Sequence, residues 1–578
     1  MKNLIIIIYV IVIIAFYSGN INGVNAEDGN YPIVNTRSGR VQGRTTKQLG
    51  GYVEKFLGIP FAQPPVGELR WRSPIQEKSW TDIRQAQKFY SACMQNENSM
   101  VELPPLQIQE DCLYLNVFRK TSANSTKNKN ATDGIPVMLF FHGGGYSLGA
   151  SGFFLYDGSE RLMQTEDDII IVTSNYRLGV FGYLGGDELR DDTASGANST
   201  GNWGFQDQRA AMEWVKESIA NFGGDPNKVT IFGESAGAGS TSVHLLAPKS
   251  NGLFHRAIIE SGPPMAVWVT RPLADANAQY NRVQAYLKCT NPTCLRSFNA
   301  SVILDAGSHS RGPHTKVKDI SWAPLIDMVE LNDTPSSLLN KGLINKVPVV
   351  MGTNRNEGTI LVPGLVKQLQ KNKTNYNNTL QQLLGEKLGV EVAKEYLLED
   401  YPEPAAWWAA TTAFGDVAMT CPSRESARLL SKAGVPVWLY FLNHELDAMK
   451  SVLSFLHYGV FHGTDLIFVW NKSLVLFSEA EQQLAETFGK MWTSMAIHGD
   501  PTVTSKVNWP KYNETNDINL RIDIPFSIET GLKKEKCDWW KTHPFDPNNI
   551  TSVHTIFNDD IGSNGVDAYN DIWKQLYH

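Results

Sequence analysis

The chain has 578 residues, 42% of them apolar, which is enough to bury a large core. Its 52 basic and 59 acidic residues give a formal net charge of -7, which argues against nucleic acid as the main partner. No linker, charge run or internal repeat divides the chain after its first 26 residues, so we expect one large domain there.

The first 26 residues are typical of a cleaved secretory signal peptide. Lys2 precedes thirteen apolar or aromatic residues, Leu4 to Phe16, and a small-residue pattern ends at Ala26. The alternative is an uncleaved signal anchor, but the run is shorter than the ~20 residues that span a bilayer. We therefore expect a secretory-pathway protein, either extracellular or in the lumen of a secretory or endolysosomal vesicle, without a membrane span after cleavage.

Glycosylation sequons and cysteines agree with export. The sequence contains ten N-x-S/T sequons, at Asn124, Asn130, Asn198, Asn299, Asn332, Asn372, Asn377, Asn471, Asn513 and Asn549. Six cysteines suit three disulfides in an oxidising compartment, although sequence alone permits about 15 pairings. No cysteine pair has zinc-ligand spacing, and we expect neither a metal nor a cofactor.

Short apolar runs alternate with amphipathic stretches along the chain. Buried strands are predicted within residues 136–145, 169–179, 228–237, 254–262, 346–354 and 435–444. Residues 207–222 have the apolar spacing of a helix, and the polar insert 121–134 is predicted to be a surface loop between strands. The alternation predicts an α/β fold in which helices cover both faces of a mostly parallel sheet, with active residues at the carboxyl ends of the strands.

The stretch "IFGESAGAGS" places Ser235 between a predicted strand and a predicted helix. One interpretation is a small residue in a loop, because a bare G-x-S-x-G pattern is common in a glycine-rich chain. The other is a nucleophile on a tight strand-to-helix turn, where Gly233 and Gly237 leave room for the close approach. Strand, turn and helix in this order favour the nucleophile.

A nucleophilic serine needs a base, a group that orients the base, and donors for the oxyanion. His462 follows an apolar, strand-like run and precedes a glycine, with His457 as the local competitor. Glu357 follows another strand-like run, although an acid in such a loop is more often simply solvated. "HGGG", ending at Gly145, follows a strand, and consecutive glycines let backbone N–H groups converge.

Together these stretches resemble the type-B carboxylesterase/cholinesterase family of α/β-hydrolases over nearly the whole length after residue 26. The resemblance rests on "FLGIPFAQPPVGELRWRSP", "EDCLYLNVF", "FHGGGYSLG", "SNYRLGVFGYL", "GNWGFQDQRAAMEWVKESIANFGGDPNKVTIFGESAGAGS", "IIESGPPMAVW", "GTNRNEGT" and "GVFHGTDLIFV". It implies a hydrolase domain over residues 27–555, and residues 556–578 remain as a tail with a short helix.

The resemblance also implies roles for individual residues. The nucleophile, base and orienting acid would be Ser235, His462 and Glu357, and the oxyanion donors would be the N–H groups of Gly144, Gly145 and Ala236. A buried network behind these residues would comprise Glu234, Ser261 and Asp465. Trp268 matches an acyl-pocket position, with an ordinary core tryptophan as the alternative. The implied disulfides and structural ion pairs are Cys93–Cys112, Cys289–Cys294, Cys421–Cys537, Arg70–Glu110 and Arg177–Asp207.

The resemblance predicts a carboxylesterase rather than a cholinesterase. In cholinesterases a tryptophan in the first disulfide loop forms a cation–π seat for choline, and residues 93–112 contain none. We expect a small-molecule ester as the partner, with an uncharged, short- to medium-chain acyl group. The alternative is an abundant storage, crystalline or adhesion-type secretory protein on the same fold with little turnover. The sequence leaves the oligomeric state open.

Overall fold

The structure is a computed structural model that describes residues 31–96, 105–121, 134–191, 193, 197–310, 322–362, 369, 373–472, 477–503 and 507–545. The predicted signal peptide, most of the polar insert 121–134 and the predicted tail helix lie outside these residues. So do four of the sequons, Asn124, Asn130, Asn372 and Asn549.

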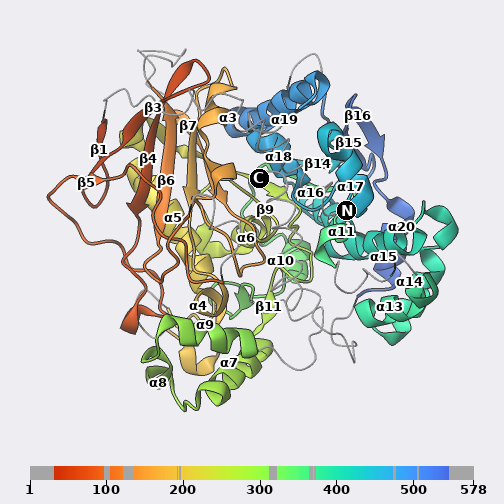
Figure 1. Cartoon of the computed structure of the whole chain (residues 1–578), viewed down its shortest axis with the longest axis horizontal. Helices are drawn as coiled ribbons and strands as arrows, with labels where there is room; N and C mark the ends of the chain where they lie inside the picture. Colours follow the sequence, from red (N-terminus) through yellow and green to blue (C-terminus); the bar gives the residue numbers. More distant parts are fainter. Residues whose placement is uncertain are drawn as a thin grey trace, which may run out of the picture.

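An eleven-stranded sheet forms the centre of the molecule (Figure 1). From edge to edge it contains β16 (Ser527–Thr530), β15 (Ile518–Ile522), β14 (Val437–Leu442), β13 (Val349–Asn354), β10 (Arg256–Glu260), β9 (Gly224–Glu234), β7 (Ile135–Phe141), β8 (Ile170–Ser174), β6 (Tyr114–Lys120), β4 (Gly51–Pro60) and β3 (Arg44–Gln48). The strands from β15 to β8 are parallel, and the strands at both edges are antiparallel. The parallel strands are almost entirely buried, as expected for a sheet with both faces covered.

Two small sheets accompany the large one. They contain β1 (Ile33–Asn35), β2 (Arg40–Gln42) and β5 (Arg84–Gln85), and β11 (Arg271–Pro272) and β12 (Leu325–Ile326).

Helices surround the central sheet, and α5, α6 and α19 contact its middle strand β9. Two helical groups stand apart at the periphery in Figure 1, one with α7, α8 and α9, the other with α13, α14, α15 and α20. The helices are α3 (Ser159–Met163), α4 (Gly179–Tyr183), α5 (Trp203–Ser218), α6 (Ala236–Leu246), α7 (Leu273–Leu287), α8 (Pro292–Arg296), α9 (Ala300–His309), α10 (Pro335–Lys341), α11 (Gly358–Leu361), α13 (Tyr376–Leu384), α14 (Glu386–Glu395), α15 (Ala405–Gly415), α16 (Cys421–Lys432), α17 (Lys450–Leu456), α18 (Thr464–Trp470), α19 (Glu479–His498) and α20 (Lys534–Thr542).

The predicted strands are confirmed as β7, β8, β9, β10, β13 and β14, and the predicted helix is α5. The apolar run before His462 is a loop in which Phe461 forms only an isolated bridge with Asn356. The reason is local, because Gly459 and Gly463 on either side of the run have positive φ angles and interrupt an extended strand.

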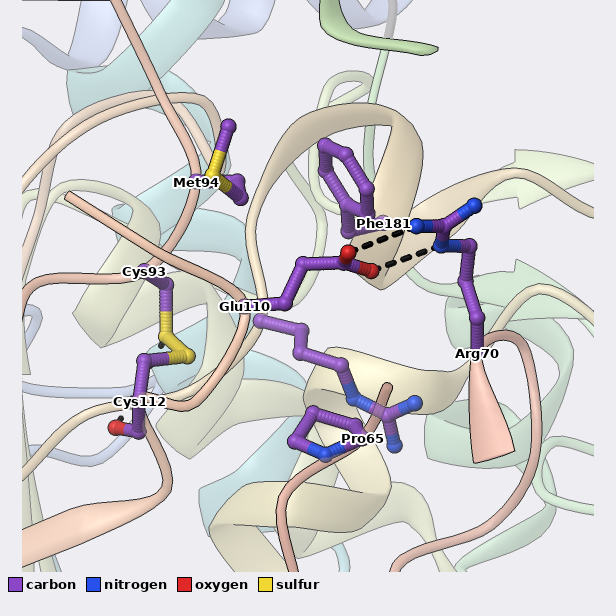
Figure 2. Close-up of a pocket in the computed structure, with 8 residues that line it drawn as sticks. Pro65, Arg70, Cys93, Met94, Glu110, Cys112 and Phe181 are labelled. Carbon is purple, nitrogen blue, oxygen red and sulfur yellow. Dashed lines mark hydrogen bonds and ion pairs between the residues drawn. A yellow bond between two sulfur atoms is a disulfide. The ribbon is translucent and has the colours of Figure 1, made fainter. Parts of the chain in front are cut away.

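A small cavity of about 10 Å³ lies beside the first disulfide (Figure 2). It is lined in part by Phe181 and by Arg70, whose guanidinium makes two 2.6 Å hydrogen bonds to Glu110. Its volume is about that of one water molecule. The cavity is therefore too small for an ester substrate, and its lining includes none of the expected catalytic side chains.

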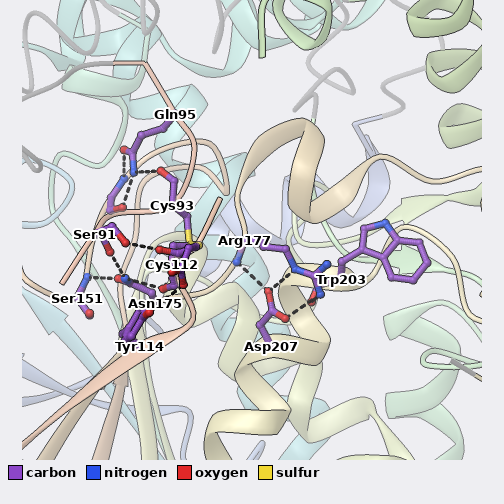
Figure 3. The surroundings of a disulfide bond; sticks show 12 residues. Ser91, Cys93, Gln95, Cys112, Tyr114, Ser151, Asn175, Arg177, Trp203 and Asp207 are labelled. Atoms are coloured by element: carbon purple, nitrogen blue, oxygen red, sulfur yellow. Dashed lines mark hydrogen bonds and ion pairs between the residues drawn. A yellow bond between two sulfur atoms is a disulfide. The ribbon is translucent and has the colours of Figure 1, made fainter. Parts of the chain in front are cut away.

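The described cysteines form the three expected disulfides, Cys93–Cys112, Cys289–Cys294 and Cys421–Cys537. Polar contacts enclose the first of them (Figure 3). Asn175 donates to the Ser91 and Cys112 carbonyls at 2.8 and 3.0 Å. Nearby, Arg177 pairs with Asp207 through two 2.8 Å hydrogen bonds (Figure 3). The buried pair of Arg177 and Asp207 connects the segment after β8 to α5.

The described sequons differ in accessibility. Asn198, Asn299, Asn332 and Asn377 are exposed and Asn513 is half-buried. Asn471 is only 1% exposed, where it ends α18 in a left-handed conformation. The side chain of this expected site is therefore packed in the interior of the described structure, and its glycosylation stays a prediction.

Candidate active site

Ser235 lies on a sharp turn between β9 and α6. Its φ and ψ are 55° and -123°, a sparsely populated combination for a residue with a side chain. The neighbouring strand stabilises this backbone, because the Ser235 N–H donates to the Glu260 carbonyl at 2.9 Å. The turn leaves Ser235 half-buried while its flanking residues are buried, so it is the residue of the turn that solvent reaches.

The glycines around Ser235 permit a very close approach of three backbone segments. A Cβ on Gly237 would lie 1.9 Å from the Phe141 carbonyl oxygen, and one on Gly233 would lie 2.5 Å from the same atom. A Cβ on Gly262 would lie 2.5 Å from the Ser235 carbonyl oxygen. Larger residues at these positions would therefore separate β7, α6 and the loop after β10.

His462 and Glu357 come together from segments about a hundred residues apart. His462 Nδ1 lies 2.6 Å from Glu357 Oε2. The other Glu357 oxygen accepts from Ser261 Oγ at 2.5 Å and from the Asn354 N–H at 2.7 Å. Glu357 is 1% exposed and directly precedes α11. The solvated position expected for an isolated acid in this loop therefore does not form.

His457 lies elsewhere. It is half-buried, and its carbonyl accepts from Trp407 Nε1 at 2.9 Å. Among the described residues its ring has no hydrogen bond to an acid, whereas His462 does. Of the two histidines that the local sequence left open, His462 is therefore the one that contacts Glu357.

The second ring nitrogen of His462 faces Glu234. His462 Nε2 lies 3.2 Å from Glu234 Oε1, but neither atom has a well-directed hydrogen bond within the described part of the chain. No described hydrogen bond joins His462 to Ser235 either. Catalytic hydrogen bonds are often long or misaligned without substrate and tighten only when it binds.

The glycine loop after β7 lies against the turn at Ser235. A Cβ on Gly143 would lie 3.2 Å from Ser235 Cβ. Gly144 and Gly145 have φ angles of 110° and 58°, which L side chains rarely adopt. Their N–H groups donate no hydrogen bond within the described residues, and Ala236 begins α6, where helix N–H groups are also free for an anion.

Buried acids surround His462 and shift its titration. The carboxylates of Glu234 and Glu357 outweigh burial and raise the pKa of His462 to about 9. Burial raises the pKa of Glu234, and the positive charge on the neighbouring His462 opposes that rise. Burial and then Glu357 raise the pKa of Asp465 to about 6. The site therefore contains more acids than cations to neutralise them.

Asp465 connects this cluster to the sheet. It accepts from Asn354 Nδ2 at 3.2 Å and from Tyr440 OH at 3.0 Å. Sequence reasoning missed Asn354, Tyr440 and also Glu260, which is 0% exposed beside the cluster. The only available signal for Glu260 was its place before Ser261 in "IIESG", where two consecutive polar residues end an apolar strand.

Trp268 is 6% exposed, and its ring lies beside Gly239, one helical turn after Ser235 along α6. Its Nε1 donates to the Ala418 carbonyl at 3.1 Å, and a Cβ on Gly239 would lie 3.2 Å from its ring. Ala418 belongs to a π-helical segment, Asp416–Thr420. The ring therefore packs against α6 with its polar atom satisfied.

One group in the described residues has metal-ligating side chains close together, His444, Asp447 and Glu481. Their hydrogen bonds account for them without an ion. Glu481 forms a capping box with Ser478 at the start of α19, and His444 lies 3.2 Å from both Glu481 and Asp523.

Among the described helices, none is long and apolar enough to cross a membrane.

The central sheet and the serine on its strand-to-helix turn define an α/β-hydrolase. Residues 30–540 match the carboxylesterase family. The chain is also similar to a cholinesterase of Mus musculus, with 32% identity over 543 residues, covering 88% of this chain and 86% of that protein. The chain therefore belongs to the carboxylesterase family, and it is a carboxylic ester hydrolase.

Proposed function

We propose that the protein hydrolyses uncharged esters through a Ser235-His462-Glu357 triad and an acyl-enzyme. The observation that carries this proposal is the 2.6 Å contact between His462 Nδ1 and Glu357 Oε2, close to a serine on a positive-φ turn. The acid fixes the tautomer of the imidazole and stabilises the imidazolium that forms when His462 accepts a proton.

In the first step Ser235 Oγ attacks the ester carbonyl carbon while His462 takes the hydroxyl proton. The resulting oxyanion accepts hydrogen bonds from the N–H groups of Gly144, Gly145 and Ala236, each typically worth about 3 kcal/mol. His462 then donates its proton to the departing alcohol. Water, activated by the same imidazole, releases the acid and regenerates Ser235.

For this chemistry the His462 ring must turn its Nε2 from Glu234 toward Ser235. The two carboxylates near His462 stabilise its charged form, which is also the form that exists after His462 has taken a proton from Ser235 or from water. Glu234, Ser261 and Asp465 act behind the reacting atoms, where they hold Glu357 and set the charge around the imidazole.

The proposed substrates are esters without a cationic alcohol. The first disulfide loop contains no tryptophan to bind a quaternary ammonium group, in contrast to the arrangement expected of a cholinesterase. Trp268 is proposed to border the acyl side of the site, because its ring packs against Gly239, one helical turn after Ser235. The disulfides and exposed sequons support a protein of the secretory pathway.

The test is hydrolysis of p-nitrophenyl esters of increasing acyl length by purified protein, with Ser235→Ala as the control. We expect turnover of the short and medium esters, which the variant loses together with covalent labelling by an organophosphate. Labelling that persists in the variant would refute Ser235 as the nucleophile. Faster hydrolysis of acetylcholine than of a neutral acetate would refute the proposed specificity, and folded wild type without turnover would favour a storage or adhesion role.

A further inference from the structure

Glu260 is a buried acid that the proposed mechanism does not use. It is the last residue of β10 and pairs in register with Glu234 of β9 and with Gly352 of β13. In-register residues of parallel strands direct their side chains to the same face, so Glu260 and Glu234 are neighbours on one side of the sheet. Glu260 is 0% exposed.

The Glu260 carboxyl group has a single hydrogen bond among the described residues. Trp492 Nε1 of α19 donates to Oε1 at 2.6 Å, and Oε2 is buried without a partner. An ionised carboxylate that is fully buried with one donor and no cation is strongly destabilised. A neutral carboxylic acid in the same place is destabilised far less.

The titratable groups around Glu260 are acids rather than bases. Glu234 faces it from β9 and Asp465 from α18, while Tyr440 of β14 donates to Asp465. Strand β13 contains no titratable residue. The only titratable residue of α6 is His244, which stacks on Phe205, a residue of α5.

Another buried glutamate shows what a stabilised carboxylate looks like in this protein. Glu481 is also 0% exposed, but its oxygens accept from the backbone N–H groups of Asp447 and Ser478 at 2.7 and 2.9 Å. His444 Nε2 lies 3.2 Å away. Among the described residues Glu260 has neither kind of partner.

We propose that Glu260 carries its proton in the folded enzyme at neutral pH, and that this proton limits the negative charge behind His462. If Glu260 were ionised, a further carboxylate beside Glu234 and Asp465 would hold the imidazole in its charged form, which cannot accept the proton of Ser235. Burial, reinforced by Asp465, raises the pKa of Glu260 well above its usual range, in agreement with the geometry. The link to turnover rests on the proposed function, but the protonation does not.

The first test is infrared spectroscopy of the full-length wild type at neutral pH. We expect a carbonyl band of a protonated carboxylic acid that is absent from Glu260→Gln and retained in the matched variant Glu481→Gln. A wild type without such a band at neutral pH overturns the proposal, whether or not the variants fold.

The second test is stability against pH. If the pKa of Glu260 is raised in the folded state, the native protein retains on Glu260 a proton that the unfolded chain releases above about pH 4.5. The unfolding constant of the wild type should therefore rise relative to that of Glu260→Gln by about ten-fold per pH unit across the neutral range. A variant that is less stable than the wild type by a constant amount at every pH would contradict the proposal.

The third test measures the pH dependence of kcat/KM in two variants that each replace a glutamate by glutamine on neighbouring strands. Glu234→Gln removes a charge next to His462 and should therefore shift the acidic limb of the kcat/KM profile. Glu260→Gln replaces one neutral group by another and should leave that limb in place. An equal shift in Glu260→Gln would show that Glu260 is ionised. Absence of turnover with the infrared band present would instead overturn the proposed function alone.

Discussion

At the scale of single residues, the site depends on how each side chain of the triad is held. Glu357 accepts from Ser261, from the Asn354 backbone and from His462, so both of its oxygens have donors. His462 in turn lies between two carboxylates. These contacts lead to two predictions about activity.

Replacing Glu357 by glutamine should lower kcat by about 10⁴-fold. The amide has nearly the same shape but offers N–H or a neutral oxygen to His462 Nδ1, so it no longer stabilises the imidazolium. Steady-state kinetics on a p-nitrophenyl ester measures the loss. The control is Glu217→Gln, because Glu217 forms only a surface ion pair with Arg37. If Glu357→Gln keeps activity within about ten-fold of the wild type, Glu357 is not the orienting acid.

Replacing Glu234 by glutamine should shift the acidic limb of kcat/KM to lower pH. His462 must be neutral to act as a base, and the Glu234 carboxylate raises its pKa. Removing that negative charge favours the neutral imidazole, so the base becomes available at lower pH. The pH profile of kcat/KM on an ester without ionisable groups measures the shift. A shift to higher pH would show that Glu234 does not act on His462 as a carboxylate.

At the scale of elements, the site forms where the backbones of three segments approach one another closely, because glycines place no side chains between them. The carboxyl end of β7, the start of α6 and the loop after β10 converge around Ser235. Gly237 is the tightest point, because a Cβ there would meet the Phe141 carbonyl oxygen at 1.9 Å. The added Cβ is fixed to the backbone of α6, and the oxygen belongs to the backbone of β7. Neither atom can therefore move without displacing its element.

Gly237→Ala should therefore destabilise the protein by about 3 kcal/mol or more and abolish ester hydrolysis. The control is Gly50→Ala in the turn between β3 and β4. Gly50 has a φ of 83° but no atom within 4 Å of an added Cβ, so its cost should be only the left-handed strain of about 1 kcal/mol. Melting temperatures and ester turnover of both variants measure the difference. Equal effects would mean that the close approach at Gly237 can relax.

At the scale of the whole molecule, the disulfides restrain the chain to very different extents. Cys421–Cys537 connects α16 to α20 over a separation of 116 residues, whereas Cys289–Cys294 spans only 5. In the chain-entropy account a cross-link stabilises mainly by restricting the unfolded chain, more so for a longer loop.

Replacing both cysteines of the long-range pair by serine should cost about 5 kcal/mol, compared with about 2 kcal/mol for the short pair. Urea unfolding of the two double variants under non-reducing conditions measures both values. Equal losses would indicate that local packing rather than loop length decides the contribution of each bond.

Much of the fold could be predicted because the signals are local. A buried parallel strand appears as a short apolar run, and a strand, a glycine-flanked serine and a small-residue helix follow one another without interruption at Ser235. The strand-like run before His462 shows the limit of this rule, because an apolar run is equally compatible with a buried loop. Phe461 is 0% exposed there although it belongs to no strand.

The sequence by itself determined the class of the protein, the order of its central strands along the chain and the position of the serine that we propose as the nucleophile, since these depend on residue patterns within about ten positions. Only the tertiary structure decided that His462 rather than His457 meets Glu357, that Asn471 is buried, and that Glu260 lies beside two other acids with a single described hydrogen bond. Those outcomes depend on which side chains from distant segments come to share a low-dielectric interior, and burial and charge there are properties of the packed molecule.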